Sequence, residues 1–341
     1  MERLIYLDSF EELYNCSKYS ASQWTNKFGK PNPWVGGIYL VSGFVYELLY
    51  IPLLSVMVQP KFFQRSCYKI MFYLGIVDFS CIFVNSIICG YWSIQGFVFC
   101  SSPVAIYVLG CFATGLWACA CATCLLLAIN RCLALVHPLL SRKVFGGERT
   151  WFWLILPTIY SFFFIIFTNP ALFTSRHHAM FFNPYVDIPE FDDEEENKKR
   201  SHLPHTINNV SIIVLLSCSY LVLCVLLVVN SNNSRNTRIN RLQQQTFIQA
   251  SLICGFNATA AGIYVLMQFI KIPNALVLVG QIAWQASHGA VVFIYLLLNN
   301  HIRLCPAESC FFRDLWRFLP AVLPESDSRP ILNCRLQYPL Q

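Results

Sequence analysis

The chain has 341 residues, of which 56% are hydrophobic and 12% charged, and its formal net charge at pH 7 is +6. Soluble globular proteins carry about twice this share of charged residues. The balance argues against a polar soluble enzyme, a disordered chain, a coiled coil and a collagen-like fibre.

The apolar residues gather into seven long runs. These runs are residues 34–58, 70–92, 103–129, 151–170, 210–229, 247–270 and 275–298. About 20 helical residues cross the roughly 30 Å hydrocarbon core of a bilayer, and each run is long enough to do so. The runs contain two charged residues, Glu47 and Asp78, and this depletion is typical of membrane spans because a charge in hydrocarbon is costly. The sequence therefore predicts an all-α membrane protein, a seven-transmembrane helix bundle over residues 34–298.

The charges of the connecting segments predict how the bundle is oriented. Segments 59–69, 130–150, 230–246 and 299–341 together hold 15 Lys and Arg against 5 Asp and Glu, whereas the segments on the other side hold 9 against 11. The positive side faces the cytoplasm. We therefore expect residues 1–33 to be an extracellular N-terminal segment and residues 299–341 a cytoplasmic tail. The net positive charge follows from this asymmetry and does not indicate a nucleic-acid partner.

The predicted outer side carries two further features. Asn15-Cys16-Ser17 is a candidate N-glycosylation site. The longest outer loop, residues 171–209, contains the acidic run Asp192–Glu196. This loop is either a solvated connection or a lid that attracts cationic ligands.

The 16 cysteines do not form the framework of a secreted disulfide-rich protein, because most lie within spans or on the cytoplasmic side. Cys16 and Cys100 face the oxidising side, and Cys89 lies near it. Two disulfides remain open, Cys16–Cys100 and Cys89–Cys100. The cluster Cys119-x-Cys121-x-x-Cys124 lies in mid-span without a nearby His, so we expect no metal and no cofactor. Cys305 and Cys310, just beyond the last span, are candidate palmitoylation sites.

An acidic residue in the middle of a span suggests a functional polar interior. Asp78 lies in the second run, and Asn85 and His288 are its candidate partners. Glu47 lies in the first run, five residues before Pro52, where a proline kinks a helix. We group Glu47, Asp78, Asn85 and His288 as a predicted intramembrane polar network, although a structural hydrogen bond of a protonated carboxyl is the simpler alternative.

The third run ends in Asn130 and Arg131, with Pro138 seven residues after the arginine. An Arg at such an edge can bond to neighbouring helix ends in one state and release them in another, so it is a candidate activation latch. The simpler interpretation is an ordinary cytoplasmic anchor.

This stretch resembles the Asp-Arg-Tyr motif of the rhodopsin-like G-protein-coupled receptors, with Asn130 in place of the acid and Cys132 in place of the tyrosine. Asp78 resembles the buried acid of that family's second helix, Tyr295 the end of its Asn-Pro-x-x-Tyr segment, and Tyr220 its fifth-helix tyrosine. The chain departs from the family at Val291-Val292, where Asn-Pro is expected, and at Cys254-Gly-Phe-Asn257, which lacks the usual Trp and Pro of the sixth helix.

The pattern is most similar to the nematode serpentine chemoreceptors of class T. The matching pieces are Tyr14-Asn-Cys16-Ser, Leu49-Tyr-Ile-Pro52, Tyr68-Lys-Ile-Met71, Ile129-Asn-Arg-Cys132 and Trp284-Gln-x-x-His288-Gly289.

The resemblance implies a non-enzymatic chemosensory receptor in the plasma or ciliary membrane of a sensory cell. An unknown small-molecule or peptide ligand would bind between the helices, and a heterotrimeric G protein would bind at Asn130–Arg131, Ser141–Arg149 and Arg235–Arg241. The outer halves of the spans suggest a pocket lined by Tyr107, Cys111, Tyr264, Gln281 and Trp284.

The alternative function is a multi-span ion channel or transporter, which would need a line of polar residues through the core. The polar residues available for it are Glu47, Asp78, Gln281, Gln285 and His288. In the tail, residues 311–319 are amphipathic, so we expect a short eighth helix on the membrane surface, opened by Pro306.

Overall fold

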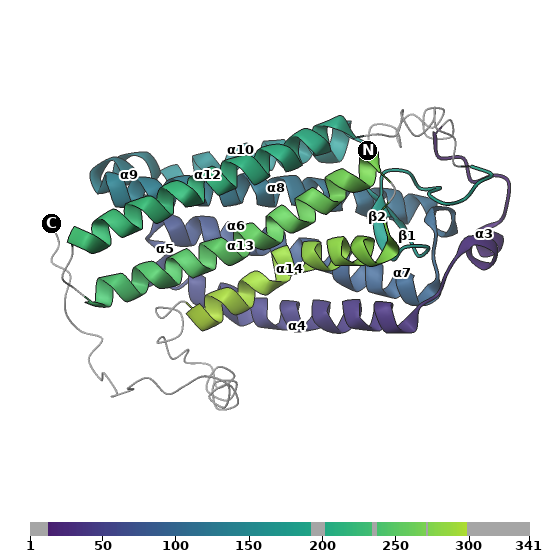
Figure 1. Ribbon diagram of the computed structural model, residues 1–341, viewed down its shortest axis with the longest axis horizontal. Coiled ribbons are helices and arrows are strands. Elements are labelled where there is room, and N and C mark those ends of the chain that lie inside the picture. The colour runs from purple at the N-terminus through teal and green to yellow at the C-terminus, as the bar shows by residue number, and fades with distance from the viewer. Residues whose placement is uncertain (1–12, 192–201, 234–236, 271, 299–341) are drawn as a thin grey trace.

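The computed structural model describes residues 13–191, 202–233, 237–270 and 272–298. Within these ranges, seven helices are long and apolar enough to cross a membrane, and they lie side by side in one elongated bundle (Figure 1). The predicted fold class is confirmed. The spans are α4 (Pro33–Met57), the continuous helix α6–η1–α7 (Ser66–Ile82, Phe83–Ile88, Cys89–Gln95), α8 (Pro103–Val136), α10 (Arg149–Phe167), α12 (Leu203–Asn233), α13 (Thr237–Phe269) and α14 (Asn274–Leu298).

Helix ends differ from the predicted spans by several residues. The second span begins at Ser66 and ends at Gln95, and the third continues through Arg131 to Val136. An apolar run marks the hydrocarbon thickness, whereas backbone hydrogen bonds continue a helix until another signal ends it. For α8 that signal is Pro138, which begins the short helix α9 (Pro138–Phe145) after the break at His137. The predicted eighth helix, Cys305 and Cys310 lie outside the described residues.

Two glycines bring the first two spans into close contact. A Cβ atom on Gly36 of α4 would lie 2.5 Å from the Gly90 carbonyl oxygen, and one on Gly90 of α7 would lie 2.8 Å from the Gly36 carbonyl oxygen. Because each glycine admits the other's backbone, a side chain at either position would force α4 and α7 apart.

A cap of residues 13–32 and 171–191 covers one end of the bundle. It contains α3 (Ala21–Phe28) and the antiparallel strands β1 (Leu172–Thr174) and β2 (Ala179–Phe181), whose register pairs Phe173 with Met180. In Figure 1 these elements lie together at the end opposite α9 and α5 (Pro60–Phe63). The sequence starts α3 with a capping box, in which Ser20 and Gln23 bond reciprocally to each other's backbone N–H.

A disulfide joins Cys16 to Cys100 and ties the cap to the start of the third span, with a Cα–Cα distance of 5.4 Å. Cys89, the other candidate, is a buried free thiol. Trp24 Nε1 donates to the Cys16 carbonyl oxygen at 3.0 Å, and Tyr185 Oη donates to the carbonyl of the exposed Asn15 at 2.9 Å. We call this end of the bundle the disulfide end and the opposite one the Arg131 end.

Candidate functional site

A buried acid–histidine contact lies in the centre of the bundle. Asp78 Oδ1 on α6 lies 2.7 Å from His288 Nδ1 on α14, and the two residues are 2% and 1% exposed. Tyr50 Oη on α4 lies 3.1 Å from Asp78 Oδ2 and 2.7 Å from the His288 carbonyl oxygen. Both carboxyl oxygens therefore have partners, which allows an acid to be held away from water. Of the two candidate partners of Asp78, His288 contacts it.

Asn85 takes part in a different set of bonds because it lies in the π-helical turn η1. The Cys89 N–H, which would bond to the Asn85 carbonyl in an α-helix, points instead to the carbonyls of Val84 and Ser86. The freed Asn85 carbonyl accepts from Gln281 Nε2 at 3.0 Å and from Gln285 Nε2 at 2.9 Å.

Glu47 lies apart from both groups. Its side chain is half-buried, and Oε1 has no hydrogen-bond partner among the described residues. The structure thus joins Asp78 and His288. Asn85 lies about two helical turns further along the second span, and Glu47 belongs to neither group.

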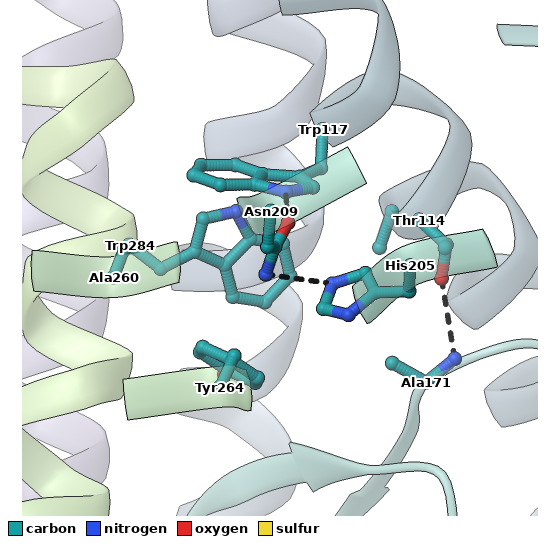
Figure 2. Close-up of a pocket in the computed structure, with 9 residues that line it drawn as sticks. Thr114, Trp117, Ala171, His205, Asn209, Ala260, Tyr264 and Trp284 are labelled. Carbon is teal, nitrogen blue, oxygen red and sulfur yellow. Dashed lines mark hydrogen bonds between the residues drawn. The ribbon is translucent and has the colours of Figure 1, made fainter. Parts of the chain in front are cut away.

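A small cavity of about 20 Å³ lies between the helices and the cap (Figure 2). Six side chains with a polar atom line it: Thr114, Trp117, His205, Asn209, Tyr264 and Trp284. Three alanines complete the wall, one of them Ala171 of the cap, directly before β1. The cavity is therefore bounded on one side by the cap and otherwise by α8, α12, α13 and α14.

Two of the five predicted pocket residues, Tyr264 and Trp284, line this cavity. Gln281 lies behind Tyr264, whose Oη donates to Gln281 Oε1 at 2.6 Å. Tyr107 packs edge-on against Tyr14 of the cap, with the ring centroids 5.4 Å apart. Cys111 is a buried thiol that does not line the cavity.

The residues that α12 and α8 contribute to the cavity were not predicted from the sequence. Trp117 Nε1 donates to Asn209 Oδ1 at 2.8 Å, and Asn209 Nδ2 donates to the Ala261 carbonyl at 3.3 Å. The apolar run begins at residue 210, so His205 and Asn209 were assigned to a loop, although α12 begins at Leu203. The three-residue spacing of Thr114 and Trp117, which places them on one helix face, was the available signal.

Trp117 connects the cavity to the buried acid–histidine contact. Its ring lies edge-on to the His288 ring, with 5.8 Å between centroids and 77° between planes. One side of Trp117 therefore faces the cavity residue Asn209, and another faces the partner of Asp78.

At the Arg131 end, three of the predicted latch residues, Arg131, Tyr220 and Tyr295, lie within electrostatic range of one another. Arg131 Nη2 lies 3.8 Å from Met71 Sδ, and the Arg131 guanidinium interacts electrostatically with Tyr220 and Tyr295. Within the described ranges no Asp or Glu forms an ion pair with Arg131.

The neighbours of Arg131 make their own contacts. Asn130 Nδ2 donates to Ser66 Oγ at 3.0 Å, and Cys132 Sγ donates to the Ser219 carbonyl at 3.7 Å. The buried Lys69 bonds to the Gly147 carbonyl at 2.9 Å and lies 3.3 Å from Glu148 Oε1. These contacts hold α6, α8, α12 and the α9–α10 connection together around Arg131. Among the described residues, no group of three His, Cys, Asp or Glu could hold a metal ion.

The comparisons with known proteins agree with this arrangement. The family described as "Serpentine type 7TM GPCR chemoreceptor Srt" matches residues 3–313. The chain belongs to this family. "Serpentine receptor class T-55" of Caenorhabditis elegans is 25% identical over 293 residues, which cover 85% of this chain and 78% of that protein. The predicted resemblance to class T is confirmed, and the receptor is a multi-pass membrane protein of a chemoreceptor family.

Proposed function

We propose that the receptor binds a chemosensory ligand between its helices at the disulfide end and signals to a heterotrimeric G protein at the Arg131 end. The loop charges predict that the disulfide end is extracellular and the Arg131 end cytoplasmic. The plasma or ciliary membrane of a sensory cell would place the first end toward the stimulus. The observation that carries the proposal is Trp117, which contacts both the cavity and the centre of the bundle.

The geometry suggests how binding at one end would alter the other. A ligand that displaces Trp117 changes the surroundings of His288 and so the contact between α6 and α14 through Asp78. Tyr295 on α14 lies within electrostatic range of Arg131, so a shift of α14 would alter the surroundings of the guanidinium. Binding would then favour one of two arrangements of the helices at the Arg131 end.

Arg131 is suited to such a change because its partners are weak. A carboxylate would form charge-assisted hydrogen bonds with the guanidinium, which are about twice as strong as neutral ones. Among the described residues, Arg131 instead has the Cys67 thiol, the Met71 thioether and two tyrosines nearby, none of them a carboxylate. When Arg131 exchanges these contacts for a G-protein surface, it therefore loses less interaction free energy than it would by breaking an ion pair.

Replacement of Arg131 tests the coupling. The full-length receptor is expressed with a promiscuous Gα subunit, a panel of volatile and water-soluble odorants is applied, and nucleotide exchange is measured for the compounds that activate it. Arg131→Ala should abolish the response while surface expression persists. Arg65→Ala, which removes an exposed charge at the same end, should respond as the wild type. A normal ligand response in Arg131→Ala would refute the role of Arg131.

A further inference from the structure

The polar atoms that line the cavity are almost all engaged. Asn209 Oδ1 accepts from Trp117 Nε1 and from Asn208 Nδ2, and Asn209 Nδ2 lies near the Ala261 carbonyl and His205 Nε2. Thr114 Oγ1 donates to the Gly110 carbonyl and accepts from the Ala171 N–H. Tyr264 Oη donates to Gln281. These side chains leave little capacity to bind a polar ligand.

Trp284 is different. It is 6% exposed, and among the described residues its Nε1–H has no hydrogen-bond acceptor. Its indole lies edge-on to Tyr264, with 5.7 Å between centroids, and Figure 2 shows it between Trp117 and Tyr264 at the cavity. A buried donor without an acceptor is destabilising, so an acceptor that enters the cavity would be favoured at this atom.

The cavity also lacks charge. Apart from Tyr264, His205 is the one titratable side chain in the lining. Its Nε2 lies 3.5 Å from the amide nitrogen of Asn209, and its Nδ1 lies 3.3 Å from the amide nitrogen of Gln268. Both amides are held in this orientation by other bonds, Asn209 by Trp117 and Gln268 by the His202 N–H. A protonated imidazole would point N–H groups at NH₂ groups, so the geometry favours neutral His205.

Size is the third restriction. A cavity of about 20 Å³ holds about one water molecule, so an organic ligand has to displace one of the aromatic side chains. The space gained is then about that of one ring, which favours a small ligand. A cation in this space would find no carboxylate in the cavity lining to pair with. The nearby acid, Asp78, is paired with His288, and Trp117 packs against that histidine.

We infer that the cavity takes a small, uncharged, largely apolar molecule with one hydrogen-bond acceptor, such as a ketone or an ester, and that Trp284 Nε1–H donates to that acceptor. This inference rests on the proposed function, because it assigns the ligand class of the same site. The acidic run of the outer loop suggested cationic ligands, whereas the uncharged lining of the cavity favours neutral ones.

The test measures binding without a G protein. The full-length receptor is purified in lipid nanodiscs, and the Tm is followed against four probes: 2-heptanone, propyl acetate, heptylamine and heptanoate. A fifth probe, 2-methyl-1-heptene, replaces the carbonyl oxygen of 2-heptanone by a methylene group. The ketone and the ester should raise the Tm, and the amine and the carboxylate should not. The alkene should bind about five-fold more weakly than the ketone, the effect of one neutral hydrogen bond.

Trp284→Phe keeps an aromatic ring and removes the donor. In this variant the preference for 2-heptanone over 2-methyl-1-heptene should disappear, whereas Trp92→Phe, a buried indole outside the cavity, should retain it. The inference is overturned if the amine or the carboxylate stabilises the receptor, if neither ketone nor ester does, or if the preference survives in Trp284→Phe. Comparison of the ketone and the alkene on the wild type decides the matter even if Trp284→Phe does not fold.

The two proposals fail in different ways. Ketone binding that never causes nucleotide exchange would contradict the proposed coupling and leave the ligand class intact. Nucleotide exchange driven by a charged ligand would support the coupling and overturn the ligand class.

Discussion

At the residue scale, the contact between Asp78 and His288 is the clearest case of a polar group held in the membrane interior. Three helices supply its atoms, and each carboxyl oxygen has a partner within 3.1 Å. Removal of one partner of such a group leaves the other buried and unsatisfied, which costs more than the bond itself contributes.

Asp78→Ala should therefore lower the free energy of unfolding by about 2–4 kcal/mol, because His288 Nδ1 loses its acceptor. Thermal unfolding of the purified receptor measures this loss. Ser80→Ala removes a hydroxyl on the same helix that, in the described part of the chain, bonds to the Ile76 carbonyl alone, so it should change the Tm little. Equal effects of the two substitutions would show that the acid–histidine contact contributes no particular stability.

The sequence predicted Asn85 and His288 as candidate partners of Asp78, because a charge in a span needs a polar partner, and in the structure His288 is the one that contacts it. The cavity was harder to predict. Asn209 and Trp117 are 92 residues apart, and only the packing of α12 against α8 brings them together. Trp284 and Tyr264 were predicted from their depth in the spans, but the absence of an acceptor for Trp284 Nε1 is a property of the packed side chains.

At the element scale, the π-helical turn η1 converts a backbone carbonyl into a binding group. The Asn85 carbonyl loses its helical donor and gains two glutamine side chains from α14. The second span is thereby fixed to the last one at this level. Nothing in the residues Phe83–Ile88 signals a π turn, so the sequence predicted a regular helix and a direct role for the Asn85 side chain.

The two glutamines should therefore act together. Gln285→Leu alone leaves the Asn85 carbonyl one donor and should cost about 1 kcal/mol of unfolding free energy. The double variant Gln281→Leu/Gln285→Leu leaves the buried Asn85 carbonyl without a side-chain donor. Its loss of unfolding free energy should exceed the sum of the losses in the two single variants. A double-mutant cycle on thermal or denaturant unfolding tests this. Strict additivity would mean that the glutamines do not share the carbonyl.

The seven spans were predictable because hydrocarbon selects for long uncharged runs, and their existence needs no tertiary information. The ends of the helices could not be predicted in this way, because a helix such as α8 continues beyond its apolar run until Pro138 ends it. The β1–β2 hairpin gave no signal either. Its strands are three residues each, too short for an alternating pattern, and β1 packs against α8 and β2 against α14.

At the scale of the whole molecule, the cap and the bundle form one unit through the disulfide. Cys16 and Cys100 are separated by 84 residues, so the bond restricts the unfolded chain over a long loop, an effect of about 2–4 kcal/mol.

Cys16→Ser should abolish the mobility difference between reduced and non-reduced receptor and lower the Tm. Cys89→Ser, the change at the rival cysteine, should leave the mobility difference intact because Cys89 is a free thiol. The opposite pattern in a gel of the two variants would show that Cys89 is the partner of Cys100.

The cap should also loosen in acid. His178 lies between β1 and β2, and burial, followed by the nearby charges of His177 and Lys30, lowers its pKa from 6.5 to about 4. The unfolded chain therefore binds the proton more tightly, so stability falls as the pH drops from about 6.5 to about 4. His178→Asn keeps a residue that tolerates the local φ of 54° and removes the titration. Between pH 7 and pH 5, the Tm of His178→Asn should fall less than the Tm of the wild type. His137→Asn changes an exposed histidine and serves as the control, which should behave as the wild type. An equal fall of the Tm in all three proteins would show that another group governs the acid response.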